Sequence, residues 1–209
     1  KYDQINEFLK MLPPLEEEAS GRGDRAFTVV DCGCGKAYLT FALYFYLSGV
    51  VGFKNVKIIG VDRRLDVIDS ARKAAKALDV EDKVVFEECD LADYNAENID
   101  MVVSLHACDT ATDEALAKAV EWKVKYILSA PCCQHELQKH VSSLAGRHTG
   151  AGKEFAGLLR QSILRERMCD ILTDSFRALI MRILGFRTQV VEFVSSEATA
   201  RNIMLKCEY

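Results

Sequence analysis

The sequence predicts an α/β fold: a doubly wound, mostly parallel seven-stranded sheet that ends in an antiparallel hairpin. Apolar strand-like segments followed by helical segments recur in five successive βα units, which is typical of parallel sheets with right-handed crossovers. Two more apolar segments then close the chain and can pair as a hairpin. With 209 residues, 49% of them hydrophobic, the chain is long enough to bury the core of one such domain.

The N-terminal part of the chain predicts a helix, a loop, a strand and a second helix. Apolar residues at helical spacing predict a helix over 2–11, and Pro13-Pro14 ends it because proline cannot continue a helix. The polar, glycine-containing stretch 16–25 predicts a loop. Segment 27–31 is apolar or β-branched and predicts a buried strand, and the almost wholly apolar stretch 37–47 predicts a helix.

The same pattern continues to the C-terminus. Further strands are predicted at 56–61, 83–87, 99–105, 124–130, 187–194 and 203–207, and further helices at 65–78, 112–120 and 154–184, the last as one or two helices. Thr112 or Asp113 can cap its helix, and Gly185 is suited to end the long helical stretch. We therefore expect a helix and loop at 1–26 and a main domain at 27–209, with a helical insertion around 136–184.

The charge of the chain is unevenly distributed. The net charge is −4, so the surface as a whole does not attract nucleic acid. Residues 79–100 contain nine acids and one base, whereas residues 139–187 contain nine bases and four acids. The basic half predicts either a contact with an anionic substrate or a solvated helix face.

The eight cysteines predict free thiols in a reducing, cytoplasmic setting. Two of them, Cys132 and Cys133, are adjacent, and two others lie in a glycine-rich turn, unlike the spaced cysteines of a small secreted framework. The sequence contains neither a signal peptide nor an apolar run of membrane-spanning length, so we expect no membrane association. The chain begins at Lys1 rather than at methionine, which is typical of a piece of a longer protein.

A glycine turn directly after the first strand is the strongest local motif. Asp31 ends the strand, Gly33 and Gly35 follow, and the next helix begins near Ala37. A strand, a glycine turn and a helix N-terminus together form a nucleotide-sized cradle. In a dinucleotide fingerprint, a third glycine would stand where this sequence has Tyr38. This argues against a NAD-linked oxidoreductase.

Acidic residues recur at the ends of three successive predicted strands. Asp62 ends the second strand and can accept hydrogen bonds from both hydroxyls of a ribose, although an acid there can also cap the next helix. Asp90 follows the third strand and can accept from an adenine amino group, with Leu91 beside it. Together with Asp31, these carboxylates would repel a phosphate-rich ligand but suit an adenosyl group that carries positive charge.

The acid, the glycine turn and the second acid resemble motif I and its successors in class I S-adenosylmethionine-dependent methyltransferases, whose fold is Rossmann-like. The resemblance implies S-adenosyl-L-methionine as cofactor, held through its carboxylate, ammonium and sulfonium. It implies a set of binding residues at the strand ends, namely Asp31, Gly33, Gly35, Lys36, Asp62, Arg63, Asp90, Leu91, Leu105 and His106.

Two further motifs narrow the resemblance. The stretch from Ser104 to Asp113 reads H-x-C-D-x-A-T-D in its later part, and residues 131–135 read Pro-Cys-Cys-Gln-His. The pair resembles a branch of class I methyltransferases that includes tRNA 2′-O-methyltransferase-like and rRNA adenine dimethylase-like proteins. The resemblance covers roughly residues 4–207. Segment 196–202 also resembles the S-E-H-T-P-K-N segment of this branch but lacks its His and Pro.

The branch implies an enzyme of RNA modification, with an acceptor site formed by His106, Cys132, Cys133 and His135. Histidine there can position or deprotonate an acceptor near neutral pH. Three alternatives stay open for this group of residues: a metal site, although adjacent cysteines lack the usual spacing; a nucleophilic cysteine; and small packing residues at a strand end.

The kind of acceptor is only partly restricted. The N/D-P-P-Y/F motif for methylating exocyclic amines is absent after the fourth strand, where Ser104-Leu105-His106-Ala107 stands. This argues against ordinary amino-methylation of DNA or RNA. A methyltransferase-like binding module without turnover is the alternative function, since an intact cofactor motif establishes binding but not catalysis.

Overall fold

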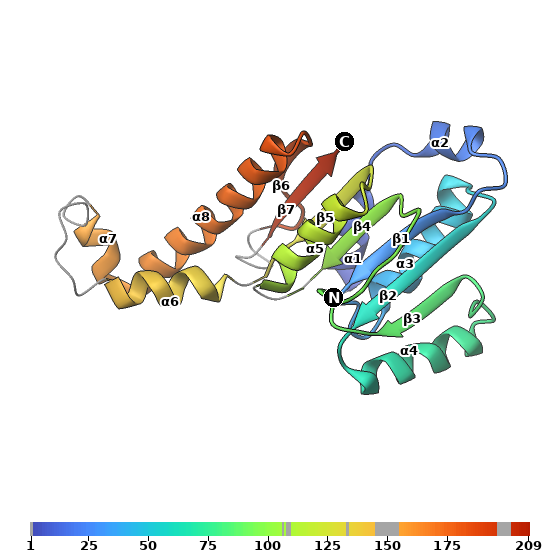
Figure 1. Cartoon of the computed structure of the whole chain (residues 1–209), viewed down its shortest axis with the longest axis horizontal. Helices are drawn as coiled ribbons and strands as arrows, with labels where there is room; N and C mark the ends of the chain where they lie inside the picture. Colours follow the sequence, from blue (N-terminus) through green and yellow to red (C-terminus); the bar gives the residue numbers. More distant parts are fainter. Residues whose placement is uncertain (1, 106, 108–109, 133, 145–154, 196–201) are drawn as a thin grey trace.

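The computed structural model describes residues 2–105, 107, 110–132, 134–144, 155–195 and 202–209 (Figure 1). Its centre is one sheet in the order β3-β2-β1-β4-β5-β7-β6. The strands are β1 (Phe27–Cys32), β2 (Val56–Asp62), β3 (Val84–Glu88), β4 (Met101–Leu105), β5 (Tyr126–Ala130), β6 (Arg187–Glu192) and β7 (Ile203–Glu208). The first five are parallel, and β7 runs antiparallel to both β5 and β6. This confirms the predicted α/β sheet and its C-terminal antiparallel hairpin.

Helices cover both faces of the sheet (Figure 1). They are α1 (Tyr2–Lys10), α2 (Glu16–Gly21), α3 (Tyr38–Tyr46), α4 (Leu65–Ala77), α5 (Thr110–Glu121), α6 (His135–Leu144), α7 (Ala156–Arg160) and α8 (Ser162–Ile183), with a short π-helix, η1 (Leu47–Val51), after α3. In Figure 1, α6, α7 and the start of α8 project beyond the sheet. None of the helices in the described part of the chain is both long and apolar enough to span a bilayer.

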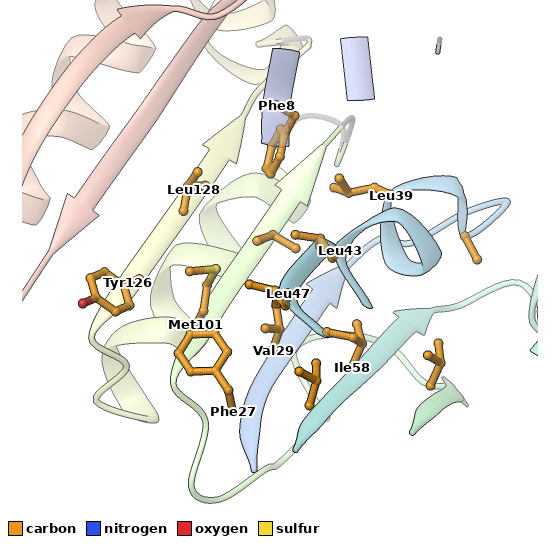
Figure 2. Packing of buried hydrophobic residues seen from close by; sticks show 14 of the residues in the cluster. Phe8, Phe27, Val29, Leu39, Leu43, Leu47, Ile58, Met101, Tyr126 and Leu128 are labelled. Carbon is orange, nitrogen blue, oxygen red and sulfur yellow. The ribbon is translucent and has the colours of Figure 1, made fainter. Parts of the chain in front are cut away.

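Alternate residues of the central strands point to opposite faces, as the pleat of a strand requires. On one face Val29 and Met101 pack with Leu43 of α3, and Phe8 of α1 joins the same cluster (Figure 2). On the other face Val102 packs in a cluster with residues of α5 and α8. The central strands are therefore buried on both sides, which is why they are so uniformly apolar, whereas the edge strand β6 is mostly exposed.

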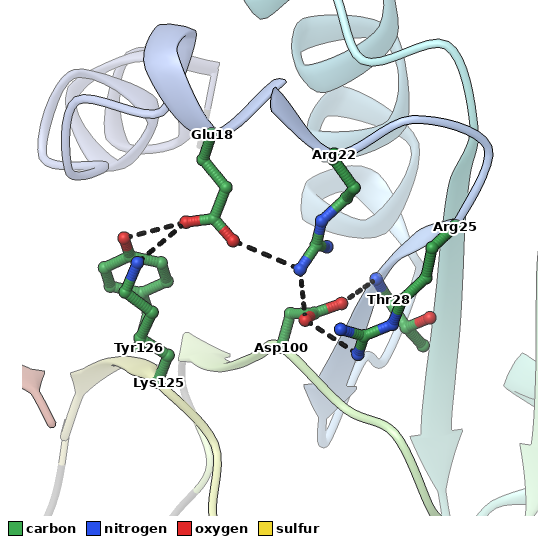
Figure 3. A network of polar contacts seen from close by, with 7 residues as sticks. All are labelled: Glu18, Arg22, Arg25, Thr28, Asp100, Lys125 and Tyr126. Carbon is green, nitrogen blue, oxygen red and sulfur yellow. Dashed lines mark hydrogen bonds and ion pairs between the residues drawn. The ribbon is translucent and has the colours of Figure 1, made fainter. Parts of the chain in front are cut away.

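Helix α2 and the residues that follow it are fastened to the end of the sheet where β1, β4 and β5 begin (Figure 3). Arg22 donates to Glu18 at 3.1 Å and also pairs with Asp100, which precedes β4. Asp100 accepts in addition from the backbone N–H of Thr28 at 2.9 Å, and Glu18 accepts from the hydroxyl of Tyr126 at 2.9 Å. These contacts join α2 to β1 and to the starts of β4 and β5.

Three local predictions were wrong. Residues 16–21 form α2 instead of a loop, because three glutamates in its first turn favour the positive end of the helix dipole. Residues 89–100 form turns, so the third of the five expected βα units lacks its helix. Helix α5 begins at Thr110, two residues early, and the Thr112 hydroxyl donates to the carbonyl of Ala107 at 2.7 Å instead of capping the helix.

The C-terminal end of α8 confirms the prediction that Gly185 ends this helical stretch. Gly185 has φ +95°, and its N–H donates to the carbonyl of Arg182 at 3.0 Å. The N–H of Phe186 donates to the carbonyl of Met181, also at 3.0 Å. This pair of bonds is a Schellman cap, in which glycine supplies the left-handed residue.

Candidate functional site

A pocket of about 820 Å³ opens at the carboxyl ends of β1 to β4. Ligands bind at this edge of a doubly wound sheet because the chain reverses its winding there. Its lining includes residues from strand ends, the glycine turn, α1, α4 and α5, namely Gln4, Ile5, Asp31, Gly33, Cys34, Gly35, Lys36, Tyr38, Leu39, Val61, Asp62, Arg63, Arg64, Val67, Cys89, Asp90, Leu91, Leu105, Ala107, Thr110, Ala111 and Glu114. The volume lies within the usual range for small-molecule sites, about 300–1,000 Å³.

Nine of the ten residues predicted to bind the cofactor line this one pocket. They are Asp31, Gly33, Gly35, Lys36, Asp62, Arg63, Asp90, Leu91 and Leu105. The tenth, His106, lies outside the described residues. The structure thus brings together side chains that the sequence spreads over seventy-five positions.

The glycine turn presents bare backbone to the pocket. Gly33 has φ +73° and Gly35 has φ +53°, a conformation that side-chain-bearing residues rarely adopt. The N–H groups of Gly33 and Cys34 both donate to the carbonyl of Val61, at 2.8 and 3.1 Å. The turn is therefore fixed to the end of β2, and a ligand can approach its backbone closely.

Asp31 is buried at the base of the pocket, with 2% of its surface exposed. Its carboxylate accepts a hydrogen bond of 2.6 Å from the hydroxyl of Thr40 on α3. Burial, reinforced by the nearby Asp62 carboxylate and opposed by the Thr40 bond, raises the pKa of Asp31 to about 7. Among the described residues, no cation pairs with this carboxylate, so a positive ligand would stabilise its ionised form.

Asp62 organises the glycine turn while lining the pocket. Its Oδ2 accepts from the N–H of Gly35 at 2.9 Å, and its Oδ1 accepts from the N–H and Nε of Arg64 at 3.0 and 3.3 Å. Arg64 itself is the residue before α4, so Asp62 does not cap that helix directly. The alternative of a simple helix cap therefore does not describe Asp62.

The far end of the pocket combines acids with apolar groups. Asp90 is exposed and accepts from the N–H of Ala92 at 3.2 Å, whereas its neighbour Leu91 is buried. Glu114 of α5 reaches the same end, and burial together with the Asp90 charge raises its pKa, while Arg63 opposes the shift. A polar rim over apolar walls suits a flat heterocycle that carries an amino group.

Sequence reasoning missed several lining residues. Glu114 could have been predicted from the sequence, because it lies one helical turn after Thr110 and Ala111 and shares a face of α5 with them. Gln4 and Ile5 carry no signal in the sequence, since they reach the pocket only because α1 packs across α3.

The structure describes two of the four residues predicted to position the acceptor, and it does not place these two in the pocket lining. Cys132 lies two residues after the end of β5 and is partly exposed, and His135 begins α6 and is exposed. Neither is among the residues that line the pocket, although Leu105 and Ala107 of the neighbouring β4 end are. The other two candidates, His106 and Cys133, lie outside the described residues, as does most of segment 196–202. Within the described ranges, no group of three or more metal-ligating side chains is close enough to hold a metal ion.

Comparison with known proteins agrees with this geometry. A family model described as a methyltransferase domain matches residues 1–140. The chain is also 32% identical over 203 residues to the glutathione S-transferase C-terminal domain-containing protein homolog of Drosophila pseudoobscura pseudoobscura, a match that covers 88% of the chain and 33% of that relative. The chain therefore spans about one third of the length of the curated relative.

Two solved structures share the fold. One is magnesium protoporphyrin IX methyltransferase from Synechocystis PCC 6803 with bound SAH, with a TM-score of 0.52, 15% identity and coverage of 97% of this chain and 83% of that one. The other is a putative rRNA methylase from Clostridium thermocellum, with a TM-score of 0.52, 16% identity and coverage of 95% and 96%. The family match extends over well beyond half of the chain, and the pocket lies where this fold places its ligand. The chain belongs to the methyltransferase domain family and is an S-adenosylmethionine-dependent methyltransferase domain.

Proposed function

We propose that the domain binds S-adenosylmethionine in the pocket at the ends of β1 to β4 and transfers its methyl group to an RNA acceptor. One observation carries the proposal: Asp31, Asp62 and Asp90, from three separate strand ends, line a single pocket beside the bare backbone of the glycine turn. Three carboxylates around a pocket favour a cationic ligand and disfavour a phosphate-rich one.

The residues present fit this cofactor. Asp31, buried and without a cationic partner among the described contacts of its carboxylate, suits the ammonium of the methionine part. Asp62 suits the ribose hydroxyls, and Asp90 suits the adenine amino group, with Leu91 as an apolar wall. The glycine turn leaves its backbone open to the methionine chain, because Gly33 and Gly35 carry no side chains and have left-handed φ angles that other residues rarely adopt.

When bound, the cofactor supplies a methyl group on a positively charged sulfur. The protein then has to hold an acceptor in line with that group, so positioning contributes most of the acceleration. On the acceptor side, Cys132 and His135 lie in the segment that follows β5, whose neighbour β4 ends in the pocket wall. We assign them, with His106 and Cys133, to acceptor positioning, and His135 or His106 to removal of the acceptor proton.

An RNA acceptor is supported by the rim of the pocket and by the sequence motifs. Lys36, Arg63 and Arg64 are exposed around the opening, where they can contact phosphates. The paired His-x-Cys-Asp and Pro-Cys-Cys-x-His motifs resemble those of RNA methyltransferases, and one structural neighbour is a putative rRNA methylase. Because another neighbour methylates a porphyrin, the acceptor class has to be tested separately from the cofactor.

Cofactor binding is tested by calorimetry with S-adenosylhomocysteine. We expect saturable binding to the wild type, and at least tenfold weaker binding to Asp31→Ala and to Asp62→Ala. Asp69→Ala is the matched control, because Asp69 is an exposed acid of α4 that pairs with Arg72 on the surface and does not line the pocket. A folded protein that binds no S-adenosylhomocysteine at millimolar concentration, or binds NADH instead, would refute the proposal.

The acceptor is tested by incubating the protein with labelled S-adenosylmethionine and total cellular RNA. Label in the RNA, lost in Asp31→Ala, is the expected result, and sequencing of the modified nucleotide then identifies the acceptor atom. Tight cofactor binding without label in RNA would exclude RNA as acceptor. If no other acceptor gains label either, the domain is a binding module without turnover.

A further inference from the structure

Four polar side chains form a continuous hydrogen-bonded chain on the α5 side of the sheet; three of them are buried, and the fourth, Asp113, is exposed. Arg177 of α8 donates through Nε and Nη2 to both carboxylate oxygens of Asp113 on α5, at 2.7 and 2.8 Å. Its Nη1 donates to Oδ1 of Asp174, also on α8, at 3.0 Å. Oδ2 of Asp174 then accepts from Nε2 of Gln134, in the segment between β5 and α6, at 2.9 Å. The chain thus joins three elements that are distant in sequence.

Burial makes this chain rigid. The exposed fractions of Gln134, Asp174 and Arg177 are 3%, 4% and 4%, so water does not compete for the bonds among these three, whereas the side chain of Asp113 at the outer end is 49% exposed. The guanidinium is planar and binds Asp113 with two parallel bonds, which fixes direction as well as distance. A shift of Gln134 would leave an Asp174 oxygen buried without its donor, and such a group is costly.

This hydrogen-bonded chain of side chains has one end at the cofactor side of the candidate site and the other end at the acceptor side. At one end, Asp113 belongs to the first turn of α5, whose neighbours Thr110 and Glu114 line the cofactor pocket. At the other end, Gln134 stands between Cys132 and His135, which we assigned to the acceptor side. The geometry therefore connects the wall of the cofactor pocket to the acceptor segment.

The side chain of Gln134 is only partly satisfied. Its Oε1 is buried and has no hydrogen-bond partner among the described residues. An apolar residue of the same length would remove this unsatisfied oxygen, but it would also leave Oδ2 of Asp174 without its donor. The amide thus has one described partner, Asp174, and its bond to that partner sets the direction in which Gln134 holds its own segment.

We propose that Gln134 is a positioning residue, which the Asp113–Arg177–Asp174 chain holds so that the acceptor segment keeps a fixed place relative to the cofactor pocket. The inference rests on the proposed methyl transfer for the role of that segment. In-line transfer is sensitive to placement, since a displacement of about 1 Å can lower a rate by about a hundredfold.

The test is Gln134→Met, which keeps the length of the side chain and removes its amide. We expect kcat for methyl transfer to RNA to fall at least tenfold while the Kd for S-adenosylhomocysteine stays within twofold of the wild type. Gln138→Met is the matched control, because Gln138 makes the neighbouring bond between α6 and α8, donating to Oδ1 of Asp170 at 3.0 Å. It should keep wild-type turnover and have a melting temperature close to that of Gln134→Met.

A second measurement does not depend on the acceptor. The rate at which iodoacetamide alkylates Cys132, followed by mass spectrometry of the folded protein, reports the placement of the segment directly. We expect a change of at least threefold in Gln134→Met, none in Gln138→Met, and no change at Cys89, which lines the pocket.

The outcomes separate the two proposals. If the wild type does not methylate RNA, the proposed acceptor is wrong, and Cys132 alkylation alone decides the role of Gln134. If Gln134→Met matches Gln138→Met in alkylation and, where transfer is measurable, in kcat, then Gln134 does not position the segment. An equal loss of cofactor affinity and turnover would likewise overturn the inference, because it would show a general loss of structure.

Discussion

Asp31 shows how a single residue can be arranged for a ligand instead of for stability. Its carboxylate is buried, it accepts a hydrogen bond from the neutral hydroxyl of Thr40, and a second carboxylate, Asp62, raises its pKa further. A purely structural carboxylate in this place would be paired with a cation or exposed to water. Perturbed groups of this kind concentrate at functional sites, where the ligand supplies the missing charge.

The affinity for S-adenosylhomocysteine should depend on pH through Asp31. Because burial raises the pKa of Asp31 to about 7, the carboxyl is mostly neutral at pH 5.5 and mostly ionised at pH 7.5. The ionised form attracts the ligand ammonium, so the affinity should rise across this range by up to about tenfold per pH unit below the pKa. Calorimetry at half-unit steps measures the profile, and Asp31→Asn should flatten it. An equally steep profile in Asp31→Asn would assign the effect to another group.

The same residue should lower the stability of the folded protein at neutral pH. The pKa of Asp31 is higher in the folded protein than in the unfolded chain, so stability is greatest below the unfolded value and is lost as the pH rises towards 7. Asp31→Asn keeps an acceptor for Thr40 and removes the charge. We expect it to be more stable than the wild type by about 1–3 kcal/mol at pH 7.5 and by much less at pH 4.5. Urea denaturation at both pH values measures the difference; a variant less stable than the wild type at pH 7.5 would contradict this account.

Much of the cofactor side of the site could be predicted from the sequence, because it is carried by residues at strand ends. Asp31, Asp62 and Asp90 each follow an apolar run, and parallel strands bring their ends to one edge. The contributions of Gln4 and of Gln134 could not be predicted in this way. They depend on how α1 and α8 pack, and packing between distant elements leaves no periodic signal in the chain.

Among the elements, β2 contains a glycine whose role is steric. A Cβ at Gly60 would lie 2.6 and 2.7 Å from the Cδ1 and Cε1 atoms of Phe86 and 3.0 Å from Sγ of Cys34. The ring of Phe86 on β3 and the thiol of Cys34 in the glycine turn thus both pack against Gly60 of β2. Strand packing and the shape of the turn therefore depend on one missing side chain.

Replacing Gly60 by alanine should accordingly strain both features. We expect Gly60→Ala to lower the free energy of unfolding by about 1–3 kcal/mol, as overpacking in a core does, and to weaken S-adenosylhomocysteine binding through the displaced turn. Gly157→Ala is the control, since nothing lies within 4 Å of a Cβ there and alanine favours a helix. Denaturant titration and calorimetry of both variants provide the comparison. A Gly60→Ala protein as stable as the wild type would show that Phe86 yields without cost.

Helices and strands could be predicted from the sequence where their residues are uniformly buried. All seven strands were expected within a few residues of their observed bounds, because runs such as 56–61 are buried on both faces. Helix α2 was not expected, and α6 was covered only by the helical insertion expected around 136–184, without bounds of its own: both helices are short, and neither presents a wide apolar face. Their stability comes from contacts such as those of Glu18 and Gln138 with other elements, which a local pattern does not contain.

At the scale of the whole molecule, the N-terminal helix is part of the domain core. Phe8 of α1 is fully buried and meets the ring of Phe193, which follows β6, in an edge-to-face contact at 6.3 Å. Helix α1 is thus joined to the segment that follows β6, next to the pocket that Gln4 and Ile5 help to line. Ligand binding at that pocket should therefore stabilise the sheet and its N-terminal helix together.

S-adenosylhomocysteine should raise the melting temperature of the whole domain in one transition. A ligand that binds only the folded state stabilises it by about 2.7 kcal/mol at one hundred times its Kd, which for a chain of this size corresponds to about 5–10 °C. Calorimetric scans with and without the ligand measure the shift. NADH at the same concentration should cause none, and Asp31→Asn should lose most of it although the variant folds. A shift that affects only part of the transition would mean that α1 and the sheet unfold separately, because a ligand stabilises only the cooperative unit to which its pocket belongs.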